Sequence, residues 1–217
     1  MMRLVVGVPL LVLVTVLGFA AEMPGWTSAD WAVAQVVQDG RNPVLTGIAL
    51  LLRLGFGTEA GVVISLGLAV FALVVRTSEA VKALMVVLAG WGAGALLKIT
   101  VDRPRPPVAH SMLGDLGAMS FPSGHVCLTA AVAVAAWVLV RRRWVVVVGV
   151  LVVAGQMLAR VYLGVHYPTD VLAALIVVAG TSLIVLAGGL RPAGDRHPAA
   201  SPLKGVSPGR LVRPPGT

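Results

Sequence analysis

A short polar stretch, Phe121-Pro122-Ser123-Gly124-His125, opens directly into the long apolar run 126–140. A proline, a hydroxyl and a glycine ahead of an apolar run favour the start of a helix, where the first backbone N–H groups have no partner within the helix. These N–H groups and the positive end of the helix dipole attract anions. The stretch therefore predicts an anion site at the start of a helix that is apolar enough to lie in a membrane.

The composition of the whole chain indicates an integral membrane protein. Of its 217 residues, 58% are hydrophobic and only 12% are charged, which is too apolar for a soluble domain of this length. A helix needs about 20 apolar residues to cross a bilayer core of roughly 30 Å. Six runs approach this length, and the expected fold is an all-α, polytopic membrane bundle of six transmembrane helices: 4–21, 60–75, 80–101, 126–140, 144–163 and 171–190.

The remaining segments are expected to lie outside the spans. Residues 23–42 are polar and predict an extramembrane loop, and residues 44–56 form an apolar run too short to span, which predicts a short interfacial helix. The first run resembles a cleavable signal peptide at its end, but it is longer than a signal core, which favours a retained helix. We therefore expect one membrane domain, residues 1–190, followed by a basic, disordered cytoplasmic tail, residues 191–217.

The net charge of +8 fits membrane topology better than nucleic-acid binding, because no basic run is interleaved with aromatic residues. With the N-terminus inside, six spans place both termini in the cytoplasm and make the protein a multi-pass component of the plasma membrane. Eleven of the 17 basic residues then lie inside, as the positive-inside rule requires: Arg3, Arg76, Lys82, Arg141, Arg142, Arg143, Arg191, Arg196, Lys204, Arg210 and Arg213.

This topology brings three polar clusters to one face of the membrane. The segments 98–105, 123–125 and 160–170 each adjoin the outer end of a predicted span. Charged residues and histidines at helix ends within a bundle are costly and usually face a polar cavity. The three clusters therefore predict one outward-facing, cationic pocket that contains two histidines.

The spacing within the clusters resembles a known family. Lys98-x6-Arg105-Pro106, then Pro122-Ser123-Gly124-His125, then Arg160-x5-His166-x3-Asp170 are similar to the three ordered motifs of the type 2 phosphatidic acid phosphatases, PAP2, which include bacterial integral-membrane lipid phosphatases. One residue departs from the pattern: Ala159 stands where the family has a serine. The resemblance implies a hydrolase that removes phosphate from a lipid phosphate or diphosphate.

The chemistry of phosphate transfer suggests a role for each residue of the motifs. Fixed positive charge must stabilise the oxygens of the phosphoryl group, and a nucleophile and an acid are needed to exchange its bonds. His166 is the expected nucleophile, forming a phosphohistidine, Asp170 would orient its imidazole, and His125 would protonate the leaving oxygen. The expected phosphate ligands are Lys98, Arg105, Ser123, Gly124 and Arg160.

The motifs bind phosphate but do not specify the lipid. An outward-facing site favours an undecaprenyl or other polyprenyl diphosphate, and phosphatidate or phosphatidylglycerophosphate is the alternative. A protein that only binds or transports lipid phosphates is a second alternative, disfavoured because binding alone does not require His125, His166 and Asp170. A soluble vanadium haloperoxidase is disfavoured by the apolar composition. No cofactor and no metal are expected, since the cations of the pocket would repel a divalent ion. The expected partners are the substrate and membrane lipids, and the sequence leaves the oligomeric state open.

Overall fold

The computed structural model describes residues 2–188, which form α-helices joined by short connections and one longer loop. No strand occurs in this part of the chain, where the loop contributes a single isolated β-bridge between Pro104 and Met119. The helices are α1 Met2–Ala21, α2 Pro24–Asp39, α3 Pro43–Gly55, α4 Thr58–Val75, α5 Ser78–Val101, α6 Gly124–Val140, α7 Arg143–Tyr162 and α8 Pro168–Ala187, with a 3-10 turn at Val108–His110.

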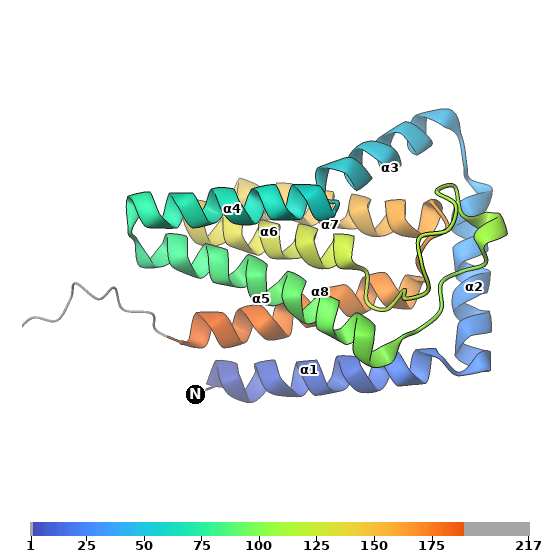
Figure 1. The fold of residues 1–217 in the computed structure, drawn as a ribbon, viewed down its shortest axis with the longest axis horizontal. Helices are drawn as coiled ribbons and strands as arrows, with labels where there is room; N and C mark the ends of the chain where they lie inside the picture. The colour runs from blue at the N-terminus through green and yellow to red at the C-terminus, as the bar shows by residue number, and fades with distance from the viewer. Residues whose placement is uncertain (1, 189–217) are drawn as a thin grey trace, which may run out of the picture.

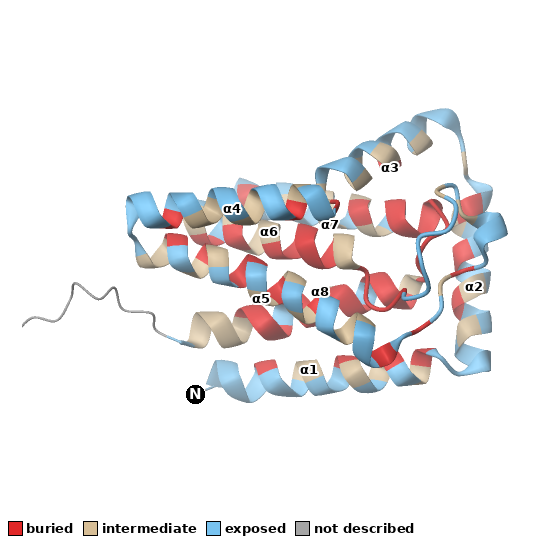
Figure 2. Ribbon diagram, viewed as in Figure 1, coloured by how far each residue is buried: buried red, intermediate tan, exposed pale blue. Residues whose placement is uncertain are grey.

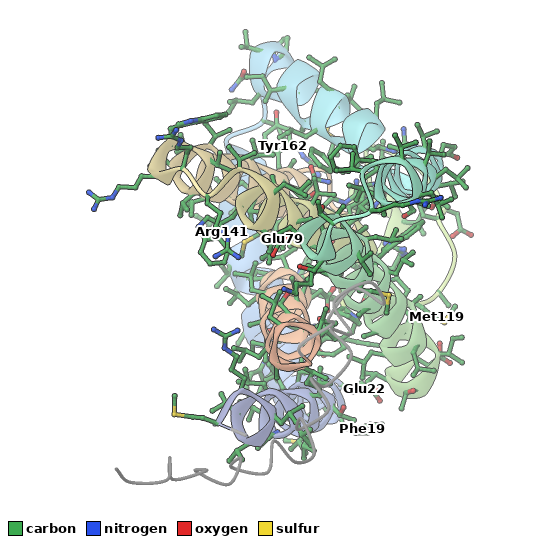
Figure 3. The ribbon with its side chains drawn as sticks, turned by 90° about the vertical axis from the view of Figure 1, so that its left-hand side faces the viewer. Phe19, Glu22, Glu79, Met119, Arg141 and Tyr162 are labelled. Carbon is green, nitrogen blue, oxygen red and sulfur yellow. The ribbon has the colours of Figure 1, made fainter. Side chains whose placement is uncertain are left out.

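The long helices α1, α4, α5, α6, α7 and α8 lie alongside one another, and α2 crosses one end of the bundle (Figure 1). Helix α8 contacts α1, α5, α6 and α7, while α6 also packs against α5 and α7. The end-on view in Figure 3 shows α8 between α1 on one side and the remaining long helices on the other. Helices α6 and α8 therefore form the centre of the bundle.

Burial follows this arrangement, as Figure 2 shows. Buried residues concentrate on α6 and α8, whereas α4 is exposed over most of its length. Many of the exposed side chains are large and apolar, including Val63, Leu66 and Leu73 on α4. Such an apolar exterior suits a lipid environment, and the all-helical membrane fold expected from composition is confirmed.

The details of the predicted topology are confirmed in part. Five helices, α1, α4, α5, α7 and α8, are long and apolar enough to cross a membrane, whereas α6 has 17 residues and is shorter. A count of six spans therefore stays a prediction. The predicted short helix at 44–56 corresponds to α3. The predicted tail, 191–217, lies outside the described residues.

The prediction of a loop for residues 23–42 is wrong, because most of this segment forms α2. Pro24 occupies the first turn of α2, where its missing N–H costs nothing. Tertiary contacts also hold the helix, since Trp26 donates a 3.0 Å hydrogen bond to Thr169 and Gln38 donates one of 3.3 Å to the Val161 carbonyl. Contacts with distant segments stabilise a helix that the polar composition of this stretch does not indicate.

Two glycines allow α5 to lie close against α6. A Cβ atom at Gly94 would lie 2.7 Å from Cys127 Sγ, and one at Gly90 would lie 3.1 Å from Ala131 Cβ. Gly92, on another face of α5, has no such neighbour within 4 Å among the residues that the structure describes. Small residues at this spacing permit close approach of membrane helices, and here that approach brings the end of α5 that carries Lys98 next to the start of α6.

Replacing Gly94 should therefore destabilise the bundle. We expect Gly94→Leu to lower the stability of the folded protein by about 1–3 kcal/mol, because the added side chain overpacks the interface with α6. Thermal unfolding in detergent measures the effect. Gly92→Leu is the matched control and should leave the melting temperature nearly unchanged; equal losses for the two variants would contradict the proposed α5–α6 contact.

Candidate active site

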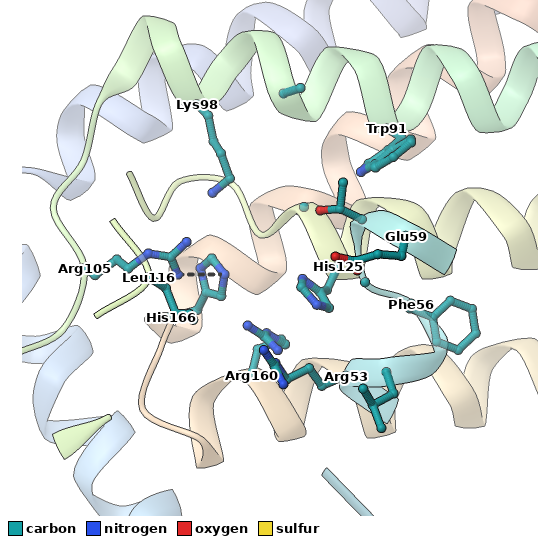
Figure 4. Close-up of a pocket in the computed structure, with 15 residues that line it drawn as sticks. Arg53, Phe56, Glu59, Trp91, Lys98, Arg105, Leu116, His125, Arg160 and His166 are labelled. Atoms are coloured by element: carbon teal, nitrogen blue, oxygen red, sulfur yellow. Dashed lines mark hydrogen bonds between the residues drawn. The ribbon is translucent and has the colours of Figure 1, made fainter. Parts of the chain in front are cut away.

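A cavity of about 650 Å³ lies at the end of the bundle where the three polar clusters meet (Figure 4). All three sequence motifs contribute to its lining. The residues that line it are Arg53, Leu54, Phe56, Gly57, Thr58, Glu59, Trp91, Ala95, Lys98, Arg105, Leu116, Gly124, His125, Arg160 and His166. The cavity is thus cationic around the histidines and apolar around Leu54, Phe56 and Trp91.

Lys98 joins the last turn of α5 to the loop that follows it. Its ammonium group donates hydrogen bonds to the carbonyl oxygens of Met119, at 3.1 Å, and Ser120, at 3.2 Å. A lysine has three N–H donors, so one remains for a bound anion. Lys98 therefore both fastens the loop and presents a positive charge to the cavity.

Arg105 contacts His166 across the cavity. Its guanidinium donates to the Val165 carbonyl at 2.8 Å and to the Gly117 carbonyl at 3.0 Å, and its Nη1 lies 3.4 Å from His166 Nε2, the contact dashed in Figure 4. This contact is long for a hydrogen bond, and because an arginine nitrogen is only a donor, it fits a His166 ring whose Nε2 carries no proton. In that tautomer the imidazole proton is on Nδ1, which faces Asp170.

Asp170 lies behind His166, on the side away from Arg105. Its Oδ2 is 3.4 Å from His166 Nδ1, which is longer than an ordinary hydrogen bond, and Nδ1 has no hydrogen-bond partner among residues 2–188. Asp170 Oδ2 also accepts a 2.9 Å bond from the Tyr167 N–H. The carboxylate is thus fixed at the start of α8, one helical turn from the histidine, where the sequence predicts it.

Arg103 connects this carboxylate to α2. Its guanidinium donates to Asp170 Oδ1 at 2.7 Å and to Asp30 Oδ2 at 2.9 Å, and it stacks on the Tyr167 ring at 4.3 Å. Asp30 also accepts a 3.1 Å bond from the Thr169 N–H. Arg103 and both carboxylates are buried. A buried ion pair is costly to break, by about 3–5 kcal/mol, so this network fixes Asp170 firmly.

Arg160 and His125 face the cavity from α7 and α6. Arg160 is only 1% exposed, and its Nε and Nη1 atoms have no hydrogen-bond partner in the described chain. Ser123 precedes α6, and its hydroxyl is likewise buried without a partner within residues 2–188. Buried polar atoms of this kind are rare in folded proteins and commonly indicate a ligand or water position.

The charge of the cavity is strongly positive. Four cationic side chains line it, whereas Glu59 is the single carboxylate among its described lining residues. Burial, together with the charges of Lys98, Arg105 and Arg160, lowers the pKa of His166 well below its ordinary value. Burial also lowers the pKa of Arg105, partly opposed by Asp170 and Asp115. His166 is therefore neutral, as a nucleophile must be.

The structure brings together most of the residues predicted from the motifs. Lys98, Arg105, Gly124, Arg160 and both histidines line one cavity, while Asp170 lies behind His166. Ser123 is adjacent in the chain but is not among the lining residues. The roles of these residues stay predictions.

Other residues of the site carry no signal in the motifs. Asp30 and Arg103 are 73 positions apart in the chain, and nothing in the sequence pairs them. Arg103 follows Asp102 in the chain, but its ion pairs in the structure are with the distant Asp30 and Asp170. Arg53, on the predicted interfacial helix, lines the cavity.

Ala159, where the family motif has a serine, lies away from the cavity. It is buried in an apolar cluster with Ala49, Leu163 and other residues of α3 and α7, and it does not line the cavity. The departure from the motif therefore leaves the cationic lining unchanged.

The donor set does not favour a metal. Within residues 2–188, no three side chains of the histidine, cysteine, aspartate and glutamate types lie close enough together to hold a metal ion. Guanidinium and ammonium groups dominate instead, and these bind anions.

Comparison with known proteins agrees with this chemistry. The profile of the PAP2 superfamily matches residues 79–190, the segment that holds all three motifs. A decaprenylphosphoryl-5-phosphoribose phosphatase from Mycolicibacterium smegmatis is 32% identical over 153 residues, which cover 70% of this chain and 82% of that protein.

Two solved structures share the fold. A PAP2-type phosphatidylglycerolphosphate phosphatase from Bacillus subtilis matches with a TM-score of 0.66 and 27% identity over 84% of this chain and 94% of its own. LpxE from Aquifex aeolicus matches with a TM-score of 0.62 and 18% identity over 72% of this chain and 94% of its own. On its sequence match, its motifs and its fold, this multi-pass membrane protein belongs to the PAP2 superfamily of phosphatases.

Proposed function

We propose that the protein is a metal-independent lipid phosphate phosphatase that works through a phosphohistidine on His166. The observation that carries this proposal is the placement of a buried, neutral imidazole among cations in one cavity, with a fixed carboxylate behind it. A cavity that only bound anions would bind them more tightly with a charged donor at this position than with a neutral imidazole.

The first step is attack of His166 Nε2 on the phosphorus atom. Arg105 and Lys98 attract the phosphoryl oxygens, and Arg160 supplies the N–H donors that have no hydrogen-bond partner within residues 2–188. The new N–P bond forms as the bond from phosphorus to the leaving oxygen breaks, and His125 gives its proton to that oxygen. The bound phosphate supplies the negative charge that favours a protonated His125 among the cations.

The second step is hydrolysis of the phosphohistidine. His125, now neutral, takes a proton from a water molecule, whose oxygen bonds to phosphorus while the N–P bond breaks. Inorganic phosphate leaves, and His166 regains its neutral form. Asp170, held by Arg103, keeps the Nδ1 proton of His166 oriented and stabilises the positive charge that develops on the ring in the first step.

The substrate is proposed to be a polyprenyl-linked phosphate or diphosphate. The M. smegmatis relative is named for a decaprenyl substrate, which favours a polyprenyl chain over a diacylglycerol. The B. subtilis structure is that of a phosphatidylglycerolphosphate phosphatase, and a glycerophospholipid is accordingly the second candidate.

The proposed orientation places both termini in the cytoplasm and the cavity at the outer face of the plasma membrane. It is supported by the basic residues of the connection between α6 and α7, Arg141 to Arg143, at the end of the bundle away from the cavity.

Phosphate release from lipids tests the function. Purified protein in detergent with excess chelator should release phosphate from a polyprenyl diphosphate, with lower kcat/KM for phosphatidate and phosphatidylglycerophosphate. His166→Ala should lower kcat by at least about a thousandfold, because it removes the nucleophile.

The matched control is His110→Ala, which removes an exposed histidine outside the cavity and should retain the parent rate. Full activity of His166→Ala would overturn the nucleophile assignment. A rate that collapses in chelator and returns only with added metal would overturn metal independence, and the absence of any release would favour a binding protein.

The titration of His166 tests the electrostatics of the cavity. A group whose pKa is lowered stays neutral as the pH falls, so protonation of His166 should occur below the ordinary histidine value of about 6.5. NMR of histidine-labelled, substrate-free protein measures this midpoint without interference from the titration of a phosphate substrate.

The His166 signal is identified by its absence in His166→Asn. Arg105→Gln should move the midpoint upward, because it removes one of the positive charges that oppose protonation. A midpoint at or above 6.5 in the parent protein would contradict the charge distribution described above.

Labelling of single cysteines tests the orientation. On a Cys127→Ser background, Ala109→Cys in the loop beside the cavity should react with a membrane-impermeant maleimide in intact bacterial cells. Arg142→Cys, at the opposite end, should react only after the cells are opened. The reverse pattern would invert the proposed topology.

A further inference from the structure

Arg53 lines the cavity but belongs to none of the three motifs. It lies in the last turn of α3, and α3 packs against α7, the helix that carries Arg160. Figure 4 shows Arg53 and Arg160 pointing into the same cavity. Helix α3 thus adds a positive charge to a site that already holds three.

Within residues 2–188, Arg53 has no ion-pair partner. Glu59 lines the same cavity but forms no ion pair with Arg53, and no side-chain hydrogen bond from the described part of the chain fixes the Arg53 guanidinium. Arg53 is half-buried, and two cations facing one cavity repel each other unless an anion lies between or beside them. A bound anion beside Arg53 would therefore stabilise its positive charge.

The position of His125 indicates on which side of the transferred phosphate this additional negative charge would lie. A Cβ atom at Gly57 would be 3.8 Å from His125 Nε2, so this nitrogen faces the turn between α3 and α4. In an in-line displacement, the leaving oxygen lies opposite the attacking His166. The leaving oxygen, which takes its proton from His125, therefore points toward the turn that follows Arg53.

The cavity becomes apolar beyond this point. Leu54, Phe56 and Trp91 line it, and Figure 4 shows Phe56 and Trp91 on the side of His125 away from His166. These apolar side chains suit the hydrocarbon part of a lipid. Arg53 accordingly lies where the leaving part of the substrate passes from the transferred phosphate to its chain.

We propose that Arg53 binds a second anionic phosphoryl group, carried by the leaving part of the substrate, and so selects lipids with two phosphoryl groups over lipids with one. This inference rests on the phosphatase function proposed above. In a prenyl diphosphate the second group is the phosphate that stays on the chain, and in phosphatidylglycerophosphate it is the phosphodiester. A guanidinium fits either group through paired N–H donors.

Two matched pairs of substrates test the proposal. Each pair shares its hydrocarbon part: geranylgeranyl diphosphate with geranylgeranyl monophosphate, and phosphatidylglycerophosphate with phosphatidate of the same acyl chains. The readout is the ratio of kcat/KM for the lipid with two phosphoryl groups to that for the lipid with one. The parent protein should favour the former in both pairs.

Arg53→Gln should lower kcat/KM for all four lipids, because it removes positive charge from the cavity. The loss should be larger for the lipids with two phosphoryl groups, so that the ratio falls by about tenfold or more, as expected for loss of one charge-assisted contact. Arg53→Lys should restore part of the ratio, since it returns the charge without the paired donors. Arg76→Gln, at the far end of α4, is the matched control and should leave the ratio unchanged.

The outcomes separate the two proposals. If the parent protein releases phosphate but Arg53→Gln loses kcat/KM equally for both members of each pair, the ratio is unchanged. This result would overturn the role of Arg53 and leave the phosphatase function standing. Failure of the parent protein to release phosphate from any of the four lipids would overturn the phosphatase function itself. Melting temperatures of the variants show whether a loss reflects unfolding, and Arg53→Lys supplies the ratio if Arg53→Gln does not fold.

Discussion

The buried pairing of Arg103 with two carboxylates is the interaction on which the rest of the site depends. Asp30 comes from α2, Arg103 from the loop after α5, and Asp170 from the start of α8, so one guanidinium ties together three separate parts of the chain. Charges removed from water must be paired to be tolerated. The pairing therefore holds α2 across the end of the bundle and fixes the carboxylate behind His166.

This pairing also explains why the neighbouring cavity is so positive. The two buried carboxylates nearest the site are already occupied by Arg103, and Lys98, Arg105 and Arg160 remain without acidic partners in the part of the chain that the structure describes. A negatively charged phosphate would relieve this imbalance. The carboxylates near the site thus stabilise the fold through Arg103, and the cavity beside them keeps its positive charge.

Much of this arrangement could be predicted from the sequence, because local spacing determines local geometry. Asp170 lies four positions after His166 at the start of a helix, which places the carboxylate one turn away. The apolar runs predicted the long helices, since length and hydropathy decide which segments enter a membrane. The three motifs meet in one cavity because alternate helix ends lie at the same end of the bundle.

The sequence could not predict contacts between distant segments. Asp30 lies in a stretch whose polar composition resembles a loop, and only its partners Arg103 and Thr169 explain a buried acid there. From the sequence, Arg53 is a single arginine in a short apolar segment. Only the packing of α3 against α7 shows that it lines the cavity. Length alone also says little about α6, a short apolar helix whose place in the bundle is set by its contacts with α5, α7 and α8.

Asp30, on α2, shows that a search for relatives of this protein should consider more than the three motifs. Asp30 supports the geometry of His166 through two intermediates, yet it lies about seventy positions before the first motif residue. Genome surveys that score only the three signatures would not register whether a homologue retains this acid. A survey that also examines the helix crossing the end of the bundle would show which homologues can form the same buried ion pairs behind the histidine.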